Sequence, residues 1–372
     1  MFTAEEMQRY SRHFVLAEVG KTGQERLKKA RVLCVGAGGL GSPVLLYLAA
    51  AGVGTLGIID DDAVELSNLQ RQVLYSIDDV GNSKAKTAKN KLEKLNPFIN
   101  IICYKEKLTH DNALAIVQNY DVVVDGSDNF AARYVVNDAC FHLKKPTVYA
   151  SVYQFEGQCS VFNTEKGPCY RCLYPTPPKN LVPNCAEAGV LGVLPGMMGT
   201  LQANEVLKLI LKVGELLTGQ LLVVNALELS FQKFEIKRQV DCCLCAMQQP
   251  FDSLPYHEGG SCRMKENTLL ELSVKELERW RQQNKNFLLL DVREEFEYQI
   301  CNLGGRLIPL KQLPTRLHEL DQNQTIVVHC KSGGRSKQAV EILQEEGFHQ
   351  VMNLTGGIMA WVKEIEPTLA MY

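Results

Sequence analysis

The residues best suited to chemistry form a short glycine-rich run near the C-terminal end of the chain. Cys330 follows the apolar stretch 325–329 and opens the run Cys330-Lys331-Ser332-Gly333-Gly334-Arg335-Ser336. This order predicts a strand that ends at a cysteine, a glycine-rich turn, and a helix that continues to about Gly347. Backbone N–H groups converging in the turn, together with the N-terminus of the helix, favour a thiolate over a thiol. We therefore expect Cys330 to act on sulfur or on phosphate.

The length of this loop favours sulfur. Four residues separate Cys330 from Arg335, one fewer than in the phosphatase signature. A shorter loop makes a smaller cradle, which suits one sulfur atom better than a tetrahedral phosphate. Lys331 and Arg335 are then candidates to stabilise a persulfide or to attract an anionic sulfur donor.

A second glycine-rich run stands near the N-terminus, where Gly36, Gly38, Gly39 and Gly41 fit the pattern G-x-G-x-x-G. The run follows an expected strand, 31–35, and opens an expected helix, with another strand at 55–59, so it lies inside a β-α-β unit. Glycines there let the backbone approach a phosphate at the helix N-terminus. Asp60 ends the next strand, where an acid accepts hydrogen bonds from ribose. This much also fits a nicotinamide dehydrogenase, or glycines that serve only a tight turn.

Charged residues at the ends of neighbouring elements favour a triphosphate over a dinucleotide. Arg71 closes a polar run just beyond the ribose position. Lys84 stands at an expected helix start, where its charge opposes the helix dipole and needs an anion. Asp128 follows another strand, at the edge where open α/β sheets bind ligands, and it suits magnesium. The other candidates in these runs are Asp62, Ser67, Asn68, Leu69, Gln70 and Asn129.

Two C-x-x-C pairs, Cys169 with Cys172 and Cys242 with Cys245, predict a closed four-cysteine zinc site. The gap between the pairs is longer than in a compact zinc ribbon, so spacing alone leaves other interpretations open. A redox C-x-x-C predicts a thioredoxin-like context, which the sequence lacks. Cys243 is adjacent to the second pair, but only Cys242 keeps the two-residue spacing to Cys245.

The length of the chain and the alternation of expected strands and helices predict a two-domain α/β protein. The chain has 372 residues, 46% of them hydrophobic, and a net charge of −2, which points to neither nucleic acid nor membrane as partner. It has no apolar run of about 18 residues and no secretory signal, so we expect a cytoplasmic protein. Alternating strands and helices predict a Rossmann-like, mostly parallel sheet covered on both faces in residues 1–246. A polar stretch, 247–266, predicts a linker to a smaller α/β domain, 267–372.

Residues 1–246 resemble the adenylating enzymes of the ubiquitin-activating superfamily, in the branch that activates sulfur-carrier proteins for molybdopterin and thiamine-thiazole synthesis. The resemblance implies ATP and magnesium as cofactors, zinc on the four paired cysteines, and a homodimer in which Arg12 reaches the partner subunit's nucleotide. The matching stretches are Arg9–Arg12, Gly36–Gly41, Asp60–Asp62, Ser67–Arg71, Gly81–Lys84, Asp128-Asn129, Cys169–Cys172 and Pro183–Glu187. The implied roles are phosphate contact for Gly38 and Gly41, ribose for Asp60, triphosphate for Asn68, Arg71 and Lys84, and magnesium for Asp128.

Residues 267–372 resemble a rhodanese domain through the loop at Cys330 and the runs Leu290–Glu297 and Gly356–Trp361. Asp291 and Arg293 in the first run are expected to support the fold. The stretch Cys301–Arg306 departs from the rhodanese pattern, and we expect this to alter local packing only.

Together the resemblances predict that the first domain adenylates a ubiquitin-like sulfur-carrier protein ending in Gly-Gly. Cys330 then takes sulfur from a cysteine desulfurase or thiosulfate and delivers it to the adenylate, and Cys185 assists release of the thiocarboxylate. The expected pathway is the synthesis of molybdenum cofactor or thiamine, or tRNA thiolation. The alternative is a conjugation enzyme that forms a thioester on Cys185, with the rhodanese domain serving only for docking.

Overall fold

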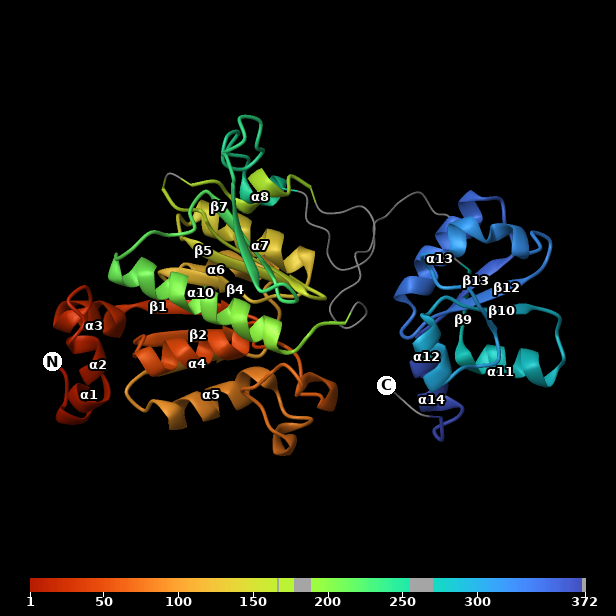
Figure 1. The fold of residues 1–372 in the computed structure, drawn as a ribbon, viewed down its shortest axis with the longest axis horizontal. Helices are drawn as coiled ribbons and strands as arrows, with labels where there is room; N and C mark the ends of the chain where they lie inside the picture. The colour runs from red at the N-terminus through yellow and green to blue at the C-terminus, as the bar shows by residue number, and fades with distance from the viewer. Residues whose placement is uncertain (166, 177–188, 255–269, 370–372) are drawn as a thin grey trace. The chain divides into compact units, whose positions relative to one another are not determined.

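The structure is a computed structural model that describes residues 1–165, 167–176, 189–254 and 270–369. These residues divide into two compact units, the first ending at residue 254 and the second beginning at residue 270 (Figure 1). Cys185 and residues 255–266 of the expected linker lie outside the described residues. No helix in the described ranges is both long enough and apolar enough to span a membrane.

The first unit is built on an eight-stranded sheet in the order β3-β2-β1-β4-β5-β6-β7-β8. The strands from β1 to β5 pair in parallel, and those from β5 to β8 pair antiparallel. The strands are β1 (Arg31–Val35), β2 (Thr55–Ile59), β3 (Asn100–Tyr104), β4 (Val122–Asp125), β5 (Thr147–Tyr153), β6 (Glu156–Phe162), β7 (Gln220–Asn225) and β8 (Ser230–Glu235).

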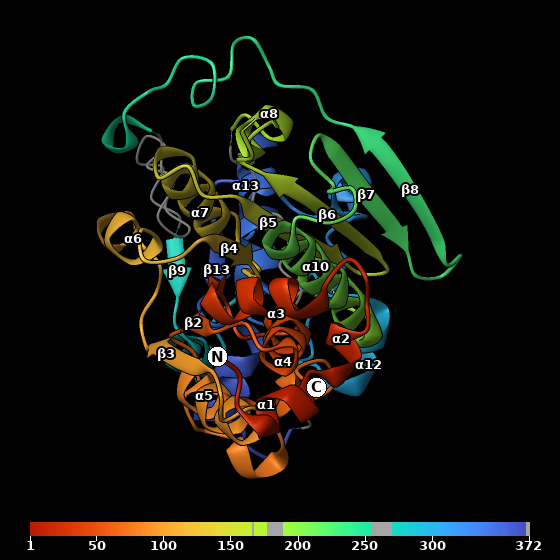
Figure 2. The ribbon, with the colours of Figure 1, turned by 90° about the vertical axis from the view of Figure 1, so that its left-hand side faces the viewer.

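Helices cover both faces of this sheet because its central strands are apolar on both sides. In β1, Val32 and Cys34 belong to one core cluster, and Leu33 and Val35 belong to the other. Figure 2 shows α4 and α10 on one side of the sheet and α6 and α7 on the other. The helices are α1 (Ala4–Arg9), α2 (Ser11–Phe14), α3 (Gly20–Lys29), α4 (Gly41–Ala51), α5 (Lys84–Leu95), α6 (His110–Val117), α7 (Phe130–His142), α8 (Tyr170–Leu173) and α10 (Val193–Leu211), with short η1 (Leu66–Asn68), η2 (Ile77–Asp79) and η3 (Phe251–Ser253).

The second unit holds a five-stranded, wholly parallel sheet in the order β11-β10-β12-β13-β9. Val328 and Cys330 face one core cluster and Val327 faces the other. The elements are β9 (Leu270–Leu272), α11 (Val274–Gln282), β10 (Leu288–Asp291), α12 (Glu295–Ile300), β11 (Arg306–Leu307), η4 (Leu313–Thr315), η5 (Leu317–Glu319), β12 (Ile326–His329), α13 (Gly334–Glu345), β13 (Val351–Leu354) and α14 (Gly357–Glu364). The two sheets confirm the expected fold class.

The first part of the expected linker, 247–266, packs on the first unit. Phe251 is 7% exposed and Leu254 is 4% exposed. The ring of His110 in α6 stacks on Phe251, with the ring centroids 4.4 Å apart. In the sequence this segment is polar and interrupted by glycine and proline. In the structure the buried side chains of Phe251 and Leu254 attach its first part to the first unit.

Candidate functional site

The glycine turn joins β1 to α4 and stands beside the end of β4. Gly36 has φ +91°, and a Cβ there would lie 2.8 Å from the Gly126 carbonyl oxygen. A Cβ on Gly41 would lie only 2.0 Å from the Gly36 carbonyl oxygen. Only glycine fits at these two positions, because the turn folds back tightly on itself before α4 begins. The turn thereby places the N-terminus of α4 at this edge of the sheet, and a helix N-terminus favours an anion.

Asp60, which follows β2, is bonded directly to this turn. One carboxylate oxygen accepts the Ala37 N–H at 2.7 Å, and the other accepts the Asp62 N–H at 2.9 Å. Burial raises the pKa of Asp60, while these bonds and the charge of Lys84 act in the opposite direction. The acid expected to meet ribose thus also holds the glycine turn in place.

Lys84, at the start of α5, is buried to 6% exposure, and its Nζ lies 2.7 Å from a carboxylate oxygen of Asp62. The side chain of Asp62 is 64% exposed. A buried ammonium with one exposed carboxylate partner can exchange that partner for a phosphate. Tyr75, which the sequence did not single out, donates its hydroxyl to the Ala37 carbonyl oxygen at 2.9 Å. Burial raises the pKa of Tyr75, so the hydroxyl stays a donor at neutral pH.

The polar run 65–71 forms a fixed turn near the glycine turn. Asn68 is 7% exposed, and its side-chain oxygen accepts the Glu65 N–H at 3.2 Å. Arg71 donates from Nη1 to the Ser67 carbonyl oxygen at 3.0 Å. This leaves the rest of the Arg71 guanidinium for an anion, because that group carries five donors in all.

The chain that follows residues 177–188 meets these same turns. A Cβ on Gly192 would lie 2.2 Å from the Gln70 carbonyl oxygen, and a Cβ on Gly39 would lie 3.1 Å from Cβ of Pro195. Helix α10 therefore begins against the glycine turn, so the N-termini of α4 and α10 meet there. This convergence adds positive potential where a phosphate is expected.

Asp128 and Asn129 follow β4 and are both exposed. Asn129 caps α7, since its side-chain oxygen accepts the Ala132 N–H at 2.9 Å. Behind them lies Arg133, which is 9% exposed, with its guanidinium over the rings of Phe130 and Tyr149 at 5.1 and 5.7 Å. Arg133 was not predicted from the sequence. Its position one turn into a helix that follows a candidate site is the signal that could have indicated it.

Arg12 does not join this group within one chain. It is exposed on α2, and in the described residues it makes no hydrogen bond or ion pair with the glycine turn. The structure brings together the glycine turn, Asp60, Lys84 and the 65–71 turn, while Asp128 lies at the adjoining end of β4.

The four paired cysteines converge on one point. The sulfurs of Cys169, Cys172, Cys242 and Cys245 all lie within 4.8 Å of one another, and all four residues are buried. Measured separations are 3.9, 3.6 and 3.2 Å for 169–172, 169–242 and 172–245. Thiolates about 2.3 Å from a tetrahedral zinc ion lie about 3.8 Å apart. The donor set therefore fits zinc with no open position. Cys243 is outside this group, which agrees with the spacing argument.

A fully buried ion pair supports the cluster from α7. Arg171, between the first two cysteines, donates from Nε and Nη2 to Asp138 at 2.9 and 2.6 Å, and both side chains are 0% exposed. The guanidinium also lies 4.7 Å from the ring centroid of Tyr134. The pair fixes the first cysteine turn to α7.

Cys330 directly follows β12 and is 1% exposed. Its sulfur accepts the Gly333 N–H at 3.1 Å and lies 3.4 Å from the Ser336 hydroxyl. Gly333 has φ +105°, a conformation that points its N–H back to the sulfur and that other residues rarely adopt. The Gly333 N–H therefore faces the sulfur, whereas the Ser336 hydroxyl lies closer to the Asn353 side-chain oxygen, at 2.7 Å.

Helix α14 sets the orientation of this loop. The Ile358 N–H donates to the Cys330 carbonyl oxygen at 2.9 Å, and the Met359 N–H donates to the Lys331 carbonyl oxygen at 3.0 Å. A Cβ on Gly357 would lie 2.5 Å from the Cys330 carbonyl oxygen, so glycine is required for this contact. With two of its carbonyls bound to α14, the loop is held in the orientation that turns the Gly333 N–H toward the sulfur.

Two arginines beside the loop, Arg293 and Arg335, are paired with carboxylates. Arg335 makes a bidentate ion pair with Glu297 of α12, at 2.6 and 2.8 Å. Arg293 and Asp291 form another pair that is 0% exposed, which agrees with a role in the fold. Burial lowers the pKa of neighbouring His329 to about 4, so this histidine is neutral and adds no charge.

Comparison with known proteins separates the chain at the same place. Residues 10–245 match the ThiF family, and residues 273–364 match the rhodanese-like domain. Over the whole chain it is 42% identical to the probable adenylyltransferase/sulfurtransferase MoeZ of Mycobacterium tuberculosis, covering 99% of this chain and 96% of that one. It is 41% identical to the adenylyltransferase and sulfurtransferase MOCS3 of Xenopus laevis, covering 98% and 88%.

The first unit has relatives of its own. The sulfur carrier protein adenylyltransferase of Thermus thermophilus is 53% identical over 66% of this chain and 92% of that one. A crystal structure of MccB from E. coli has a TM-score of 0.58 and 26% identity, covering 64% of this chain and 74% of that chain. The chain therefore belongs to the ThiF family, as an adenylyltransferase that carries a rhodanese-like sulfurtransferase domain.

Proposed function

We propose that the first unit adenylates the C-terminal glycine of a ubiquitin-like sulfur-carrier protein, and that Cys330 delivers sulfur to the acyl-adenylate. The observation that carries this proposal is the presence in one chain of a tight glycine turn before α4 and a buried thiol, Cys330, in a glycine loop before α13. The two sites complement each other, because adenylation at the first would produce an acyl-adenylate electrophile and the thiol of the second would supply the sulfur nucleophile. The Thermus relative is named for a sulfur carrier protein, which supports this substrate class.

In the first step the carrier carboxylate attacks the α-phosphorus of ATP, and pyrophosphate leaves. The chain needs no covalent nucleophile for this step, because it positions two anions and neutralises their charge. The glycine turn would hold the phosphates, Asp60 the ribose, and Lys84 and Arg71 the departing pyrophosphate. Asp128 would hold magnesium, which supplies charge neutralisation when bound. Arg12 would act across a homodimer, on the partner subunit's nucleotide.

In the second step Cys330 carries the transferred sulfur. Its thiolate takes a sulfur atom from the persulfide of a cysteine desulfurase or from thiosulfate. The Cys330 persulfide then attacks the acyl carbon, AMP leaves, and an acyl disulfide joins the carrier to Cys330. A thiol reductant, for which Cys185 is the candidate in this chain, cleaves that disulfide. The carrier leaves as a thiocarboxylate and the thiol pair is left oxidised.

The four-cysteine cluster would hold zinc as a structural ion. It ties α8 to the segment after β8, and its closed donor set leaves no position for a substrate. Zinc bound there would contribute to folding of the first unit and would take no part in the reaction.

Pyrophosphate exchange tests the proposal. The protein incubated with magnesium, ATP, labelled pyrophosphate and a Gly-Gly carrier should exchange label only when the carrier is present. Cys330→Ala should keep this exchange and lose sulfur transfer from thiosulfate. Absence of exchange with carriers of the molybdopterin, thiamine and tRNA-thiolation types would contradict the adenylation step. Loss of exchange in Cys330→Ala would contradict the division of labour between the units.

A further inference from the structure

The loop at Cys330 contains one arginine, Arg335, and its charge is paired with a carboxylate. Arg335 bonds to Glu297 through two parallel N–H···O contacts of 2.6 and 2.8 Å. The side chains are 12% and 6% exposed, so the pair is largely shielded from water and salt. A bidentate arginine–carboxylate pair of this kind is strong and geometrically fixed.

Glu297 is held in place from its own side of the pair as well. Its carboxylate accepts the Glu294 N–H at 2.9 Å, and its backbone oxygen accepts from Arg293 at 3.4 Å. Helix α12 thus presents a negative charge beside the thiol loop in one orientation. That charge offsets Arg335, one of the two cations, with Lys331, that the sequence offers to an anionic donor.

A donor other than this arginine faces the Cys330 sulfur. The Gly333 N–H, at the start of α13, donates to it, and α14 binds the loop carbonyls. The loop therefore presents backbone donors to the sulfur at close range, while Arg335, one of its two cations, is neutralised by Glu297.

We propose that Glu297 is a specificity-determining residue that neutralises Arg335 and so disfavours small, highly charged anions as sulfur donors. The donors it favours are persulfides carried on a protein cysteine, whose reacting end holds at most one negative charge. This inference rests on the proposed role of Cys330 as the sulfur-accepting thiol.

The disfavoured reaction is transfer from thiosulfate. The Cys330 thiolate attacks the outer sulfur, an S–S bond forms at Cys330 as the S–S bond of thiosulfate breaks, and sulfite leaves with the electron pair. Thiosulfate and the departing sulfite each carry two negative charges. A unit charge about 10 Å from the reacting anion, at an effective dielectric constant of about 50, changes the local concentration of a monoanion about threefold and that of a dianion about ninefold.

Two alkylating reagents of similar size measure this potential directly. Iodoacetamide is neutral and iodoacetate is anionic, and both react with the same Cys330 thiolate, so the ratio of their rates is independent of the thiol pKa. Alkylation of the Cys330 peptide is followed by mass spectrometry in the full chain. Thiosulfate transfer is measured in parallel as kcat and KM.

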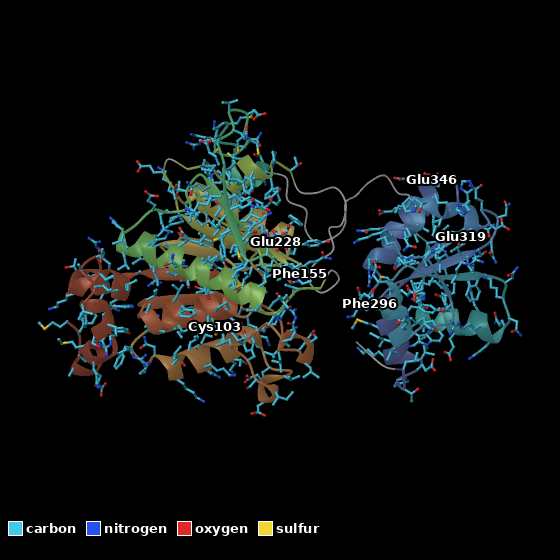
Figure 3. The ribbon with its side chains drawn as sticks, in the orientation of Figure 1. Cys103, Phe155, Glu228, Phe296, Glu319 and Glu346 are labelled. Carbon is cyan, nitrogen blue, oxygen red and sulfur yellow. The ribbon has the colours of Figure 1, made fainter. Side chains whose placement is uncertain are left out.

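Four variants of the Arg335–Glu297 pair test whether its charge controls the reaction. Glu297→Gln should raise the iodoacetate/iodoacetamide ratio about threefold and lower the KM for thiosulfate about ninefold. Arg335→Gln should lower the ratio, and the double variant should return it to the wild-type value. Glu297→Asp, which keeps the charge, should resemble the wild type. Glu319→Gln makes the same charge change at the Arg316 pair, which Figure 3 shows in another part of the unit from Phe296, and should leave the ratio unchanged.

A ratio that stays constant across these variants, with both reagents slowed or accelerated together, overturns the inference and makes Glu297 a purely structural residue. A double variant that stays at the value of Glu297→Gln also overturns it. If no variant, including the wild type, transfers sulfur from any donor while the ratios follow the expected order, the proposed role of Cys330 fails and the electrostatic role of Glu297 stands.

Discussion

Gly38 offers a sharp test of the nucleotide site because a methyl group there meets no obstacle in the protein itself. The nearest atom to a Cβ on Gly38 is Nε2 of Gln72 at 3.5 Å, an ordinary contact distance, and the backbone is not in the left-handed region. Replacing glycine by alanine at such a position stabilises a protein by about 0.4–1 kcal/mol, because the unfolded chain loses freedom. Gly38→Ala should therefore fold normally and melt at the same temperature as the wild type or slightly higher.

The effect on activity should be large. If the turn lies under the phosphates, the added methyl occupies the space of a phosphate oxygen or moves the nucleotide by about 1 Å. Displacements of this size reduce a rate about 100-fold, equivalent to about 2.7 kcal/mol. Carrier-dependent pyrophosphate exchange, measured as kcat/KM for ATP, should fall by this factor, while sulfur transfer to Cys330 from thiosulfate should be unchanged.

Gly41→Ala is the matched control. Its Cβ would lie 2.0 Å from the Gly36 carbonyl oxygen, so α4 must shift by about 1 Å, at a cost of about 1–3 kcal/mol. This variant should lose stability and exchange together. Wild-type exchange in a stable Gly38→Ala protein would refute the placement of the phosphates on this turn.

Further predictions concern the metal cluster, its supporting ion pair and Asp60. Cys242→Ser should lower the zinc content measured by a metallochromic dye, whereas Cys243→Ser should keep it, because Cys243 lies outside the cluster. Arg171→Met leaves Asp138 buried without its partner. It should lower the free energy of unfolding of the first unit by about 3–5 kcal/mol, as followed by denaturant melting, and adding Asp138→Leu should recover much of this loss. Because burial raises the pKa of Asp60, the KM for ATP should rise on acidification at a higher pH than an ordinary aspartate would show. The same shift means that the contribution of Asp60 to stability is present at acid pH and is lost as the pH rises. A KM for ATP that stays unchanged on acidification until the protein unfolds would speak against ribose recognition by Asp60.

The sequence predicted the positions that a short local pattern determines. The central strands, the glycine turn and helix 84–95 read clearly, because apolar runs alternate with amphipathic segments and each break carries glycine or proline. The cysteine pairing of 242 with 245 also followed from spacing alone. Strands β7 and β8 were not predicted. For β8 the reason is that it is exposed at nearly every residue and shows no alternation between a core face and a solvent face.

The missed features of the site depend on contacts between distant residues. The pairing of Arg335 with Glu297 joins residues on two helices, and in the sequence Arg335 is simply a cation near a thiol. In the same way, the bonds from Ala37 to Tyr75 and to Asp60 join the glycine turn to separate segments. Spacing in the sequence shows which groups are available, whereas partner choice follows from packing.

The burial of Phe251 and Leu254 has a consequence for how often Cys330 meets the adenylate. With these residues bound to the first unit, only the fifteen residues 255–269 connect the two units, and their contour length is at most roughly 55 Å. A connection of that contour length limits how far the thiol can be from the first unit, and short flexible connections in general give effective concentrations on the order of millimolar. Sulfur transfer within one chain does not then require an encounter between two protein molecules, and freeing Phe251 would lower the effective concentration by lengthening the connection.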